Sequence, residues 1–391
     1  MSVSHAARDS ARHRRGPLRP DAFRSGLHSE WIASWLGIAL GVSFTVCFLT
    51  GLLSHAIQHP PAWFHYPSRP AGLYRLTQGV HVATGIASIP LLLGKLWTVY
   101  PKLWRWPPAE SVAHAIERIS LLPLVGGSVF LLFSGVFNTF QWYPWAFFFP
   151  TAHFWAAWIT IGALIVHVGA KASGLRAGLS GAEQKPADES GADSLGRRAF
   201  LRTILAASGV LTLVTLGQTF NPLGRLALLA PRRPAAGPQG LPVNRPARNA
   251  RVAAQATDPE YRLRIEGNVG APLSLSLDDL KALPQHDAVL PITCVEGWSE
   301  SAHWSGVRLR DILAMAGARI GEGVRIESLE PRGNYRTSTL DLSHATDRDT
   351  LLALRIHDEP LALDHGYPVR LITPNLPGVM QTKWVGKVTV L

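Results

Sequence analysis

The first half of the chain contains long apolar runs separated by short polar connections, whereas the last third has no run of that length. An α-helix needs roughly 20 apolar residues to cross a bilayer. Four runs fit this length, Trp31–Leu53, Gly79–Val99, Ile119–Phe140 and Phe147–Ala170. The pattern predicts an all-α bundle of four transmembrane helices over residues 26–175, with the lipid bilayer as its partner.

From Tyr261 onward, apolar and polar residues alternate in short runs, as is typical of half-buried strands. Tyr261–Glu266 and Leu273–Leu277 follow this period of two, and the aspartates after Leu277 suit the first turn of a short helix. Further strands are predicted at Val324–Leu329, Tyr335–Leu340, Val369–Thr373 and Lys383–Leu391. We therefore expect a multidomain membrane protein in which residues 259–391 form a C-terminal α+β domain.

The connecting segments differ in composition. Residues 1–25 predict a disordered cytoplasmic tail, residues 176–196 a flexible cytoplasmic linker, and the Pro- and Gly-rich residues 221–258 an irregular linker. Between the two linkers, Gly196-Arg-Arg-Ala-Phe-Leu-Arg202 precedes a mildly apolar run. This motif resembles a twin-arginine export signal. The alternative is that its arginines simply flank a fifth transmembrane helix, which we expect over residues 197–220.

The charge distribution favours membrane orientation over nucleic-acid binding. The net charge is +11, but the excess Lys and Arg residues flank the apolar runs and lie in the linkers. The basic tail, Lys95–Arg105 and Lys171–Lys185 all fall on one side of the predicted bundle, and basic residues prefer the cytoplasmic side. We expect a multi-pass protein of the cytoplasmic membrane, with its N-terminus inside and its C-terminal domain outside.

Histidines in the predicted helices are candidate metal ligands, because ionisable residues within a membrane are functional by default. His153 and His167 lie fourteen residues apart, which returns to nearly the same helix face about 21 Å along the axis. This spacing suits two stacked haems, although a single such histidine could equally be a packing residue. His81 falls level with His153, and either His114 or His28 could face His167.

This arrangement resembles the four-helix b-type cytochromes that serve as membrane subunits of formate dehydrogenases and hydrogenases. The shared residues are His81 followed by Gly85, and the pair His153 and His167. The resemblance covers about residues 23–174 and implies one or two b haems with two histidine ligands each. In that family an early histidine of the first helix ligates the inner haem, and the first apolar run here begins without one.

A single cysteine marks the candidate site of the C-terminal domain. The apolar run Ala288–Ile292 leads to Cys294, in a predicted loop that carries Trp298 and Trp304 and precedes an amphipathic helix ending near Leu313. By itself such a cysteine is more often a buried structural thiol than a metal ligand. The only other cysteine is Cys47, so the chain has neither a disulfide framework nor a cysteine-bound iron–sulfur cluster.

Two motifs change that interpretation. Cys294-Val-Glu-Gly-Trp-Ser with Trp304-Ser-Gly-Val-Arg-Leu309, and Asp364-His-Gly-Tyr-Pro-Val-Arg-Leu371 with Lys383-Trp-Val385, resemble the sulfite-oxidase-type molybdopterin fold. Within it, the chain is most similar to the exported methionine sulfoxide reductase catalytic subunits. The resemblance covers about residues 261–391 and implies a molybdenum–molybdopterin cofactor.

The resemblance also implies roles for particular residues. Cys294 would ligate molybdenum, and the cofactor's phosphate and ring would be held by His365, Arg370 and Lys383, with backbone groups of Gln381 and Thr382. Asn244 in the preceding linker is a further candidate for contacting the pterin, and Tyr335 and Arg336 are candidates for lining the active site. Each residue alone has an ordinary alternative, such as a turn histidine or a solvated edge-strand lysine.

The chain departs from sulfite oxidases at two points. Sulfite oxidases follow the metal cysteine with a basic run that binds the anionic substrate, whereas Val295, Glu296, Gly297 and Trp298 stand here. Because the resembling domain is short, we also expect it to have no second β-sandwich of the kind with which those enzymes dimerise. The acidic and aromatic residues argue against sulfite and are compatible with a neutral, sulfoxide-like substrate.

Together these features predict a membrane-bound molybdenum oxidoreductase. Electrons would pass from quinol through b haem to the molybdenum site, where a methionine-sulfoxide-like or other small molecule would be reduced. Two alternatives remain open: the same machinery oxidising a substrate and reducing quinone, and a membrane-anchored binding module without cofactor. The sequence leaves the substrate, the quinone, the number of haems and the oligomeric state undetermined.

Overall fold

The computed structural model describes residues 23, 25–104, 111–179, 191–231, 233 and 236–391. Most of the predicted tail, Arg105 and Lys185 therefore lie outside the described residues. The chain divides into two compact units, one formed by Met1–Leu49 with His81–Leu213 and the other by Thr50–Val80 with Val214–Leu391. The segment between the first two long helices thus belongs to the same unit as the C-terminal domain.

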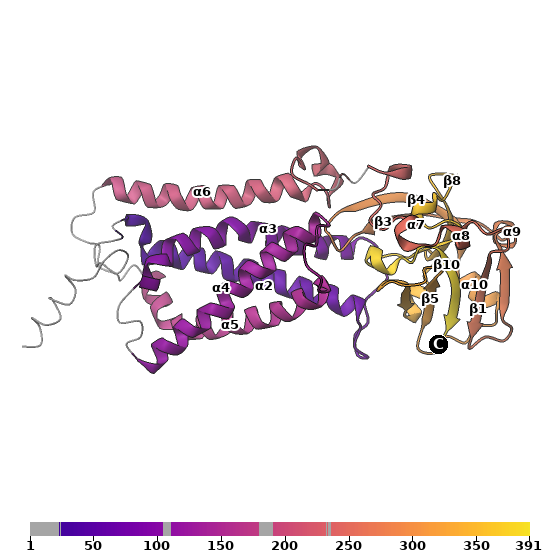
Figure 1. Ribbon diagram of the computed structural model, residues 1–391, viewed down its shortest axis with the longest axis horizontal. Coiled ribbons are helices and arrows are strands. Elements are labelled where there is room, and N and C mark those ends of the chain that lie inside the picture. The colour runs from indigo at the N-terminus through magenta and orange to yellow at the C-terminus, as the bar shows by residue number, and fades with distance from the viewer. Residues whose placement is uncertain (1–22, 24, 105–110, 180–190, 232, 234–235) are drawn as a thin grey trace, which may run out of the picture. The chain divides into compact units, whose positions relative to one another are not determined.

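Five long helices account for the apolar half of the chain (Figure 1). They are α2 (Glu30–Gln58), α3 (Leu73–Val99), α4 (Val112–Thr139), α5 (Phe149–Leu179) and α6 (Gly191–Leu216). Two short 3₁₀ helices, η2 (Gly26–His28) and η3 (Tyr100–Trp104), flank α2 and α3. Each long helix contains a stretch of the length and hydropathy that can cross a membrane. The four predicted segments and the fifth are confirmed as helices of this kind.

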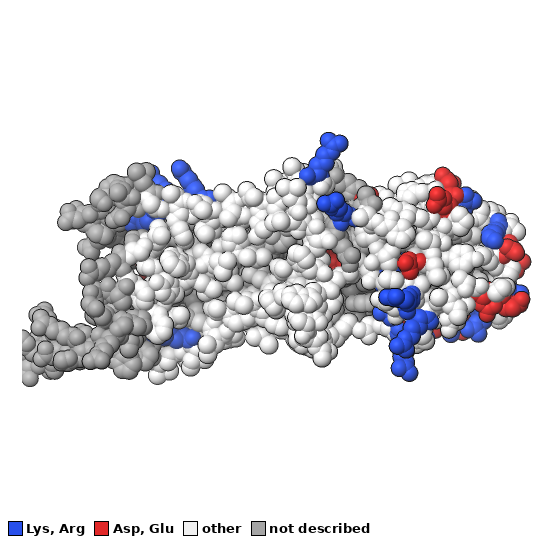
Figure 2. All heavy atoms as spheres, turned by 45° about the horizontal axis from the view of Figure 1, so that its top comes forward, with Lys and Arg blue, Asp and Glu red and all other residues white. Residues whose placement is uncertain are grey.

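The helical part has the polarity of a membrane protein. Leu93, Leu122 and Ile165 are each more than 60% exposed, whereas Ser43 and Ser88 are buried. The Ser88 hydroxyl donates to the Ser43 hydroxyl at 2.9 Å, which joins α2 to α3. Figure 2 shows helices whose visible surface is almost free of charged side chains along its length. Exposed apolar groups and satisfied interior hydroxyls suit contact with lipid.

The C-terminal unit contains two five-stranded sheets within its described residues. The first has the order β2-β1-β10-β5-β6 and is formed by β2 (Leu273–Ser276), β1 (Arg262–Gly267), β10 (Val385–Val390), β5 (Val324–Ser328) and β6 (Thr337–Leu340). The second has the order β3-β4-β7-β8, with β9 also paired to β7. Its strands are β3 (His286–Thr293), β4 (Ser299–Arg308), β7 (Leu351–Ile356), β8 (Glu359–Pro360) and β9 (Arg370–Ile372).

Short helices precede the first strand or connect the later ones. They are η4 (Asn221–Leu226), η5 (Pro238–Gly240), α7 (Ala247–Ala250), α8 (Ala253–Ala256), α9 (Leu277–Ala282), α10 (Leu309–Met315), α11 (Leu342–Ala345), η6 (Leu363–His365) and η7 (Gly378–Met380). The helix predicted after Leu277 begins with a capping box, in which the Ser276 hydroxyl and the Asp279 carboxylate each accept a backbone N–H of the other residue. The predicted α+β class is therefore confirmed.

The prediction that Trp304 lies in a loop was wrong. Trp304 lies in the middle of β4, fully buried, and its indole N–H donates to the carbonyl of Leu290 on β3 at 3.2 Å. A side chain on Gly306 would collide with the Leu352 carbonyl of β7, so only glycine permits this strand pairing. Because β4 is buried on both faces and carries Ser, His and Gly, its sequence lacks the period of two that reveals a half-buried strand.

Candidate functional site

Cys294 lies in a tight turn that joins β3 to β4. Its N–H donates to the Trp298 carbonyl at 2.9 Å, and the Gly297 N–H donates to the Cys294 carbonyl at 3.0 Å. Gly297 closes the turn with φ of 99°, a conformation that favours glycine. Cys294, Glu296 and Trp298 are all buried. The two antiparallel strands therefore hold one thiol in a fixed backbone conformation.

The thiol of Cys294 is held in its neutral form. Burial raises its pKa well above the ordinary value, and the neighbouring Glu296 raises it further. The amide nitrogen Nδ2 of Asn244 donates to the sulfur at 3.0 Å. A positive charge at the sulfur would be needed to displace the proton, and a bound metal ion supplies that charge. Asn244, predicted from the linker, is thus beside Cys294, and its Oδ1 has no partner among the described residues.

Three basic side chains gather where β9 and the start of β10 meet. Burial lowers the pKa of Arg370 to about 9. Burial and the nearby Arg370 lower the pKa of Lys383 to about 7 and that of His365 to about 4. Each shift has the same cause, which is the loss of water around a positive charge. The predicted residues His365, Arg370 and Lys383 are therefore brought together.

The basic cluster has few anionic partners of its own. The Arg370 guanidinium donates through Nη1 to the His365 carbonyl at 3.1 Å, while its buried Nε has no partner among the described residues. Lys383 Nζ donates to the carbonyls of Asp364 at 2.7 Å and Arg245 at 3.1 Å. Buried cations with unused donors suit an anion with several oxygens, such as a phosphate. The residues present therefore fit a phosphate-bearing cofactor.

The other predicted residues divide into two groups. Burial raises the pKa of Tyr335, and Cys294 and Glu296 raise it further, so this phenol lies close to the cysteine turn. The Arg336 side chain instead donates to the Pro331 carbonyl at 3.4 Å and lies 4.0 Å from the carboxylate of Glu327. Cys294 and Glu296 thus affect the Tyr335 phenol electrostatically, whereas the Arg336 side chain contacts Pro331 and Glu327.

Gln381 and Thr382 are buried in the scaffold behind the basic cluster. The Gln381 amide donates to the Leu376 carbonyl at 3.2 Å, and the Thr382 hydroxyl lies 2.7 Å from that of Ser338. The Thr382 carbonyl accepts the Leu371 N–H of β9 at 2.8 Å. Both residues therefore hold β9 and the segment before Lys383 in place.

The helical unit brings together one of the predicted histidine pairs. The ring centres of His81 and His153 are 6.5 Å apart, with an angle of 71° between their planes. Nδ1 of His81 lies 2.8 Å from the Cys47 carbonyl, and Nδ1 of His153 lies 3.0 Å from the Ser134 hydroxyl. Two imidazoles that share one metal ion, at about 2 Å per metal–nitrogen bond, have ring centres about 6 Å apart. Metal-bound histidines also commonly donate their other N–H to such oxygens.

The other candidate haem ligands, His28, His114 and His167, have surroundings that differ from those of His81 and His153. Nδ1 of His28 lies 3.3 Å from the Thr98 carbonyl, and the ring contacts Trp97 and Tyr100. The backbone N–H of His114 donates to the Ser111 hydroxyl at the start of α4. His167 lies on α5, fourteen residues after His153. These positions leave the choice of partner for His167 open.

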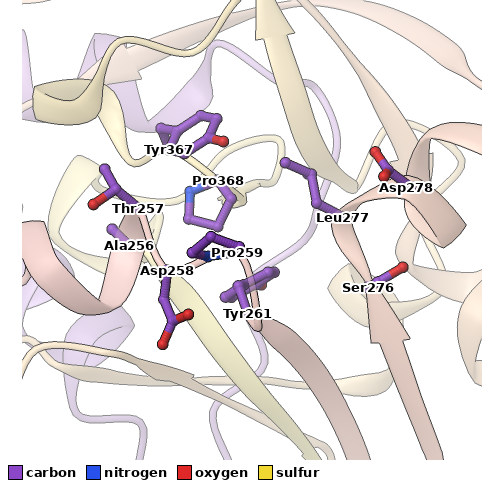
Figure 3. Close-up of a pocket in the computed structure, with 10 residues that line it drawn as sticks. All are labelled: Ala256, Thr257, Asp258, Pro259, Tyr261, Ser276, Leu277, Asp278, Tyr367 and Pro368. Carbon is purple, nitrogen blue, oxygen red and sulfur yellow. The ribbon is translucent and has the colours of Figure 1, made fainter.

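A cavity of about 330 Å³ lies elsewhere on the C-terminal unit (Figure 3). Its walls come from Ala256–Pro259, Tyr261, Ser276–Asp278 and the Tyr367–Pro368 turn. Tyr367 and Pro368 belong to the second motif, but none of the candidate ligand or catalytic residues is among the residues that line this cavity. The candidate site around Cys294 is therefore defined by its buried polar groups and not by this cavity.

Sequence reasoning missed several residues that hold the cysteine turn. Gln78, Gln218 and Thr219 are buried and hydrogen-bonded to the turn, although they lie 216, 76 and 75 residues before Cys294. Arg75 adds a bond from its guanidinium to the Ser301 hydroxyl at 2.6 Å on β4. No local pattern in the sequence marks these positions, because the fold alone brings them to the turn.

Comparison with known proteins identifies relatives of the C-terminal region. Residues 249–391 match the family model of the oxidoreductase molybdopterin binding domain. Mitochondrial sulfite oxidase of Rattus norvegicus is 35% identical over 161 residues, which cover 34% of this chain and 30% of that protein. The oxidoreductase YuiH of Bacillus subtilis is 35% identical over 127 residues, which cover 32% of this chain and 63% of that protein.

A third relative is the nitrate reductase [NADH] of Volvox carteri, 32% identical over 174 residues that cover 37% of this chain and 20% of that protein. The chain thus spans about a third of the length of the sulfite oxidases it matches, 30% for the rat protein. The family match lies wholly within the C-terminal unit.

Proposed function

Because residues 249–391 form a molybdopterin-binding oxidoreductase domain homologous to sulfite oxidases, we propose that the chain is a membrane-anchored, molybdenum-dependent oxidoreductase. One observation carries this proposal: a buried thiol on a tight turn shares a domain with the buried Arg370, whose Nε has no partner among the described residues. When bound, molybdenum–molybdopterin would supply two-electron oxygen-atom chemistry.

The chain's own residues would hold and orient this group. Cys294 would give up its proton and bind the metal as a thiolate, with the Asn244 amide donating to the sulfur. Arg370 and Lys383 would hold the phosphate, and the burial of both would exclude water from these contacts. His365 donates through Nε2 to the Pro238 carbonyl at 2.6 Å, which orients its ring beside Arg370.

In the membrane part, we propose that His81 and His153 bind a b haem. Their ring separation and their Nδ1 contacts support this assignment. A haem with two histidine ligands carries electrons and leaves no open position for oxygen. Quinol oxidation would deliver two electrons and two protons for each substrate molecule. We further propose that the N-terminus lies inside and that the twin-arginine-like motif directs the C-terminal domain outside.

The proposed substrate is a sulfoxide-like molecule. Reducing a sulfoxide consumes two electrons and two protons, breaks the S–O bond and releases a sulfide and water. Glu296 and Trp298 are buried in the cysteine turn, where a carboxylate would repel an anion such as sulfite. Tyr335 lies near the turn and is partly exposed, so its phenol would be accessible to a substrate that enters from solvent.

The opposite direction of electron flow is the second candidate. It is favoured by the name of one relative, sulfite oxidase, whereas that of another, nitrate reductase, favours reduction. In the reverse direction the substrate would gain an oxygen atom from water, and two electrons and two protons would reduce quinone. A non-catalytic membrane module is the third candidate, and the buried Nε of Arg370, which has no partner among the described residues, argues against it.

The test measures molybdenum, haem and activity on one preparation of the full chain. We expect about one molybdenum per chain, the absorption bands of a b haem and quinol-linked reduction of methionine sulfoxide. Cys294→Ser should abolish that activity, whereas Ser274→Ala, at an exposed position of β2, should leave it unchanged. A purified protein without both cofactors would refute the redox proposal, and absent sulfoxide reduction in the unmutated protein would refute the substrate.

A further inference from the structure

The turn that carries Cys294 is held by hydrogen bonds from two distant segments. The Gln78 amide nitrogen Nε2 donates to the Val295 carbonyl at 2.8 Å. The Thr219 hydroxyl donates to the Gly297 carbonyl, and the Ser299 N–H donates to the Gln218 carbonyl at 2.8 Å. Gln78, Gln218 and Thr219 are each at most 3% exposed. The peptide groups of the turn are therefore engaged by buried partners on two sides.

Both segments adjoin long apolar helices. Gln78 lies in the second turn of α3, which begins at Leu73, and Gln218 and Thr219 follow the end of α6 at Leu216. The two segments also pack against each other, since a side chain on Gly79 would come within 3.0 Å of both Phe220 and Thr219. We refer to Gln78, Gln218 and Thr219 as the turn clamp.

The segment that leads into α3 is anchored separately to the C-terminal domain. The Arg69 guanidinium pairs with Asp347 at 2.9 Å and Asp349 at 2.5 Å. The Asn375 side chain donates to the Pro67 carbonyl and accepts the Tyr74 N–H, each at 2.6 Å. These anchors bring the start of α3 to the domain, so Gln78 meets Val295 in a defined register.

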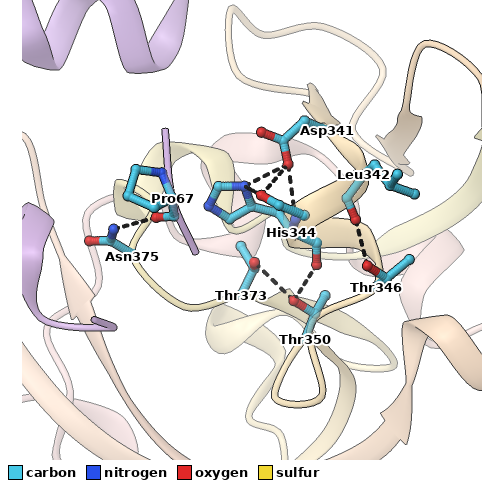
Figure 4. A network of polar contacts seen from close by, with 9 residues as sticks. Pro67, Asp341, Leu342, His344, Thr346, Thr350, Thr373 and Asn375 are labelled. Atoms are coloured by element: carbon cyan, nitrogen blue, oxygen red, sulfur yellow. Dashed lines mark hydrogen bonds and ion pairs between the residues drawn. The ribbon is translucent and has the colours of Figure 1, made fainter. Parts of the chain in front are cut away.

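The loop that carries the Arg69 partners lies within a network of hydrogen bonds, part of which Figure 4 shows. The Asp341 carboxylate accepts from the backbone N–H and Nδ1 of His344, each at 2.9 Å. The Thr350 hydroxyl donates to the His344 carbonyl at 2.6 Å and lies 3.0 Å from the Thr373 hydroxyl. Asp347 and Asp349 lie between His344 and Thr350 in the chain, and the hydrogen bonds of these two residues hold the loop in place for the ion pairs with Arg69.

We propose that the ends of α3 and α6 are part of the active site: the turn clamp positions Cys294, and the Gln78–Val295 bond joins the cysteine turn to the helix that carries His81. His81 follows Gln78 by three residues on α3. Val295 adjoins Cys294 directly. Covalent and hydrogen bonds thus form a continuous connection from the cysteine's backbone to the helix that bears the proposed haem ligand.

This inference rests on the proposed function for its electron-transfer role but not for its positioning role. His81 would hold the haem and Cys294 the molybdenum, and the haem would supply the two electrons that each sulfoxide reduction requires. Gln78 and Thr219 take no part in the chemistry and touch no substrate. They are positioning residues that act through Val295 and Gly297.

The first test uses the full chain without cofactor, produced in cells that cannot make molybdopterin. Cys294 alkylation by a maleimide is followed by mass spectrometry in Gln78→Leu and Thr219→Val. Each variant loses one hydrogen bond to the turn and should react about fivefold faster, which corresponds to about 1 kcal/mol of opening free energy. The matched control is Gln58→Leu, because among the described residues the Gln58 amide bonds within its own helix, to Ser54. Unchanged rates in both clamp variants would overturn the positioning role.

The second test uses the full chain with both cofactors in membrane vesicles. Sulfoxide-driven reoxidation of the haem is compared with sulfoxide reduction driven by reduced benzyl viologen, a soluble dye that does not need the haem. Gln78→Leu should slow haem reoxidation about tenfold, equivalent to about 1.4 kcal/mol, and should lower dye-driven turnover by a clearly smaller factor, because the dye-driven reaction loses only the positioning of Cys294. Equal losses in both assays, or a loss in neither, would overturn the coupling role.

The two tests separate this inference from the proposed function. If the unmutated protein binds no haem or reduces no sulfoxide, the proposed function fails, but the alkylation rates still decide whether the clamp positions Cys294. If the unmutated protein is active and Gln78→Leu behaves like Gln58→Leu in every assay, the clamp inference fails and the proposed function stands.

Discussion

The guanidinium of Arg370 lies over the ring of Trp304, 5.4 Å from its centroid, and both side chains are buried. This contact keeps a positive charge against an apolar strand, and Nε of the guanidinium has no partner among the described residues. Such a charge is costly unless a ligand pairs with it. We therefore expect Arg370 to stabilise the protein when an anionic cofactor is bound and to destabilise the protein without it.

We expect Arg370→Met to separate these two effects. In cofactor-free protein the substitution should leave stability unchanged or raise it by about 1–2 kcal/mol, because a buried charge is replaced by an apolar chain of similar length. In cells that make the cofactor, molybdenum content should fall at least about tenfold. Unfolding in denaturant and metal analysis measure the two effects, and a strongly destabilised cofactor-free variant would contradict the proposed role.

The lowered pKa of Lys383, about 7, predicts how the stability of the cofactor-free protein varies with pH. The unfolded chain binds a proton at this lysine up to about pH 10.4, whereas the folded chain releases it near pH 7. Unfolding therefore takes up a proton between these values, and stability rises with pH across this window. We expect Tm to increase from pH 7 to pH 9, and Lys383→Met to reduce the increase. A Tm that falls over this range would contradict the assignment.

The Asn244–Cys294 hydrogen bond predicts graded effects on metal retention. A bond to a charged thiolate contributes about 1.5–3 kcal/mol, so Asn244→Ala should weaken molybdenum retention about 10- to 100-fold. Asn244→Asp should be worse, because a carboxylate beside the sulfur repels the thiolate. Dialysis against a chelator, followed by metal analysis, measures retention. Equal retention in Asn244→Ala and the unmutated protein would remove Asn244 from the site.

Substitution of Gly306 tests the strand that the sequence did not reveal. A Cβ at this position would collide with the Leu352 carbonyl, so Gly306→Ala should destabilise the C-terminal domain by about 1–3 kcal/mol. Gly270→Ala is the matched control, since its Cβ would meet no atom closer than 3.6 Å. Thermal unfolding of the full chain in detergent compares them, and similar Tm values for both variants would contradict the tight pairing of β4 with β7.

The proposed haem ligands His81 and His153 can be tested by the absorption spectrum of the haem. His81→Ala and His153→Ala should each reduce the haem b absorption by the same amount, because the two rings would ligate one iron. His65→Ala, at an exposed position outside the helices, should leave the absorption unchanged. Loss of haem from only one of the two variants would show that the rings do not share a metal.

The amino-acid pattern alone was enough to predict the five long helices and most strands, whereas the candidate site residues came from motifs that resemble a known family. This information is local: a membrane helix needs only a long apolar run, and a half-buried strand needs only alternation. Cys294, His365, Arg370 and Lys383 were recognisable because each lies within a short motif. The strand β4 was not, because burial on both faces removes the alternation.

Only the tertiary structure decided what surrounds the cysteine. It showed that Asn244 donates to the sulfur, that Arg370 stacks on Trp304, and that Gln78 and Thr219 bond to the turn. These residues come from segments up to 216 positions away from Cys294, and their contacts depend on how the sheets pack and where α3 and α6 end. Hydrogen bonds of this kind leave no periodic trace in the chain, since each requires one polar residue at a place that only the folded backbone defines.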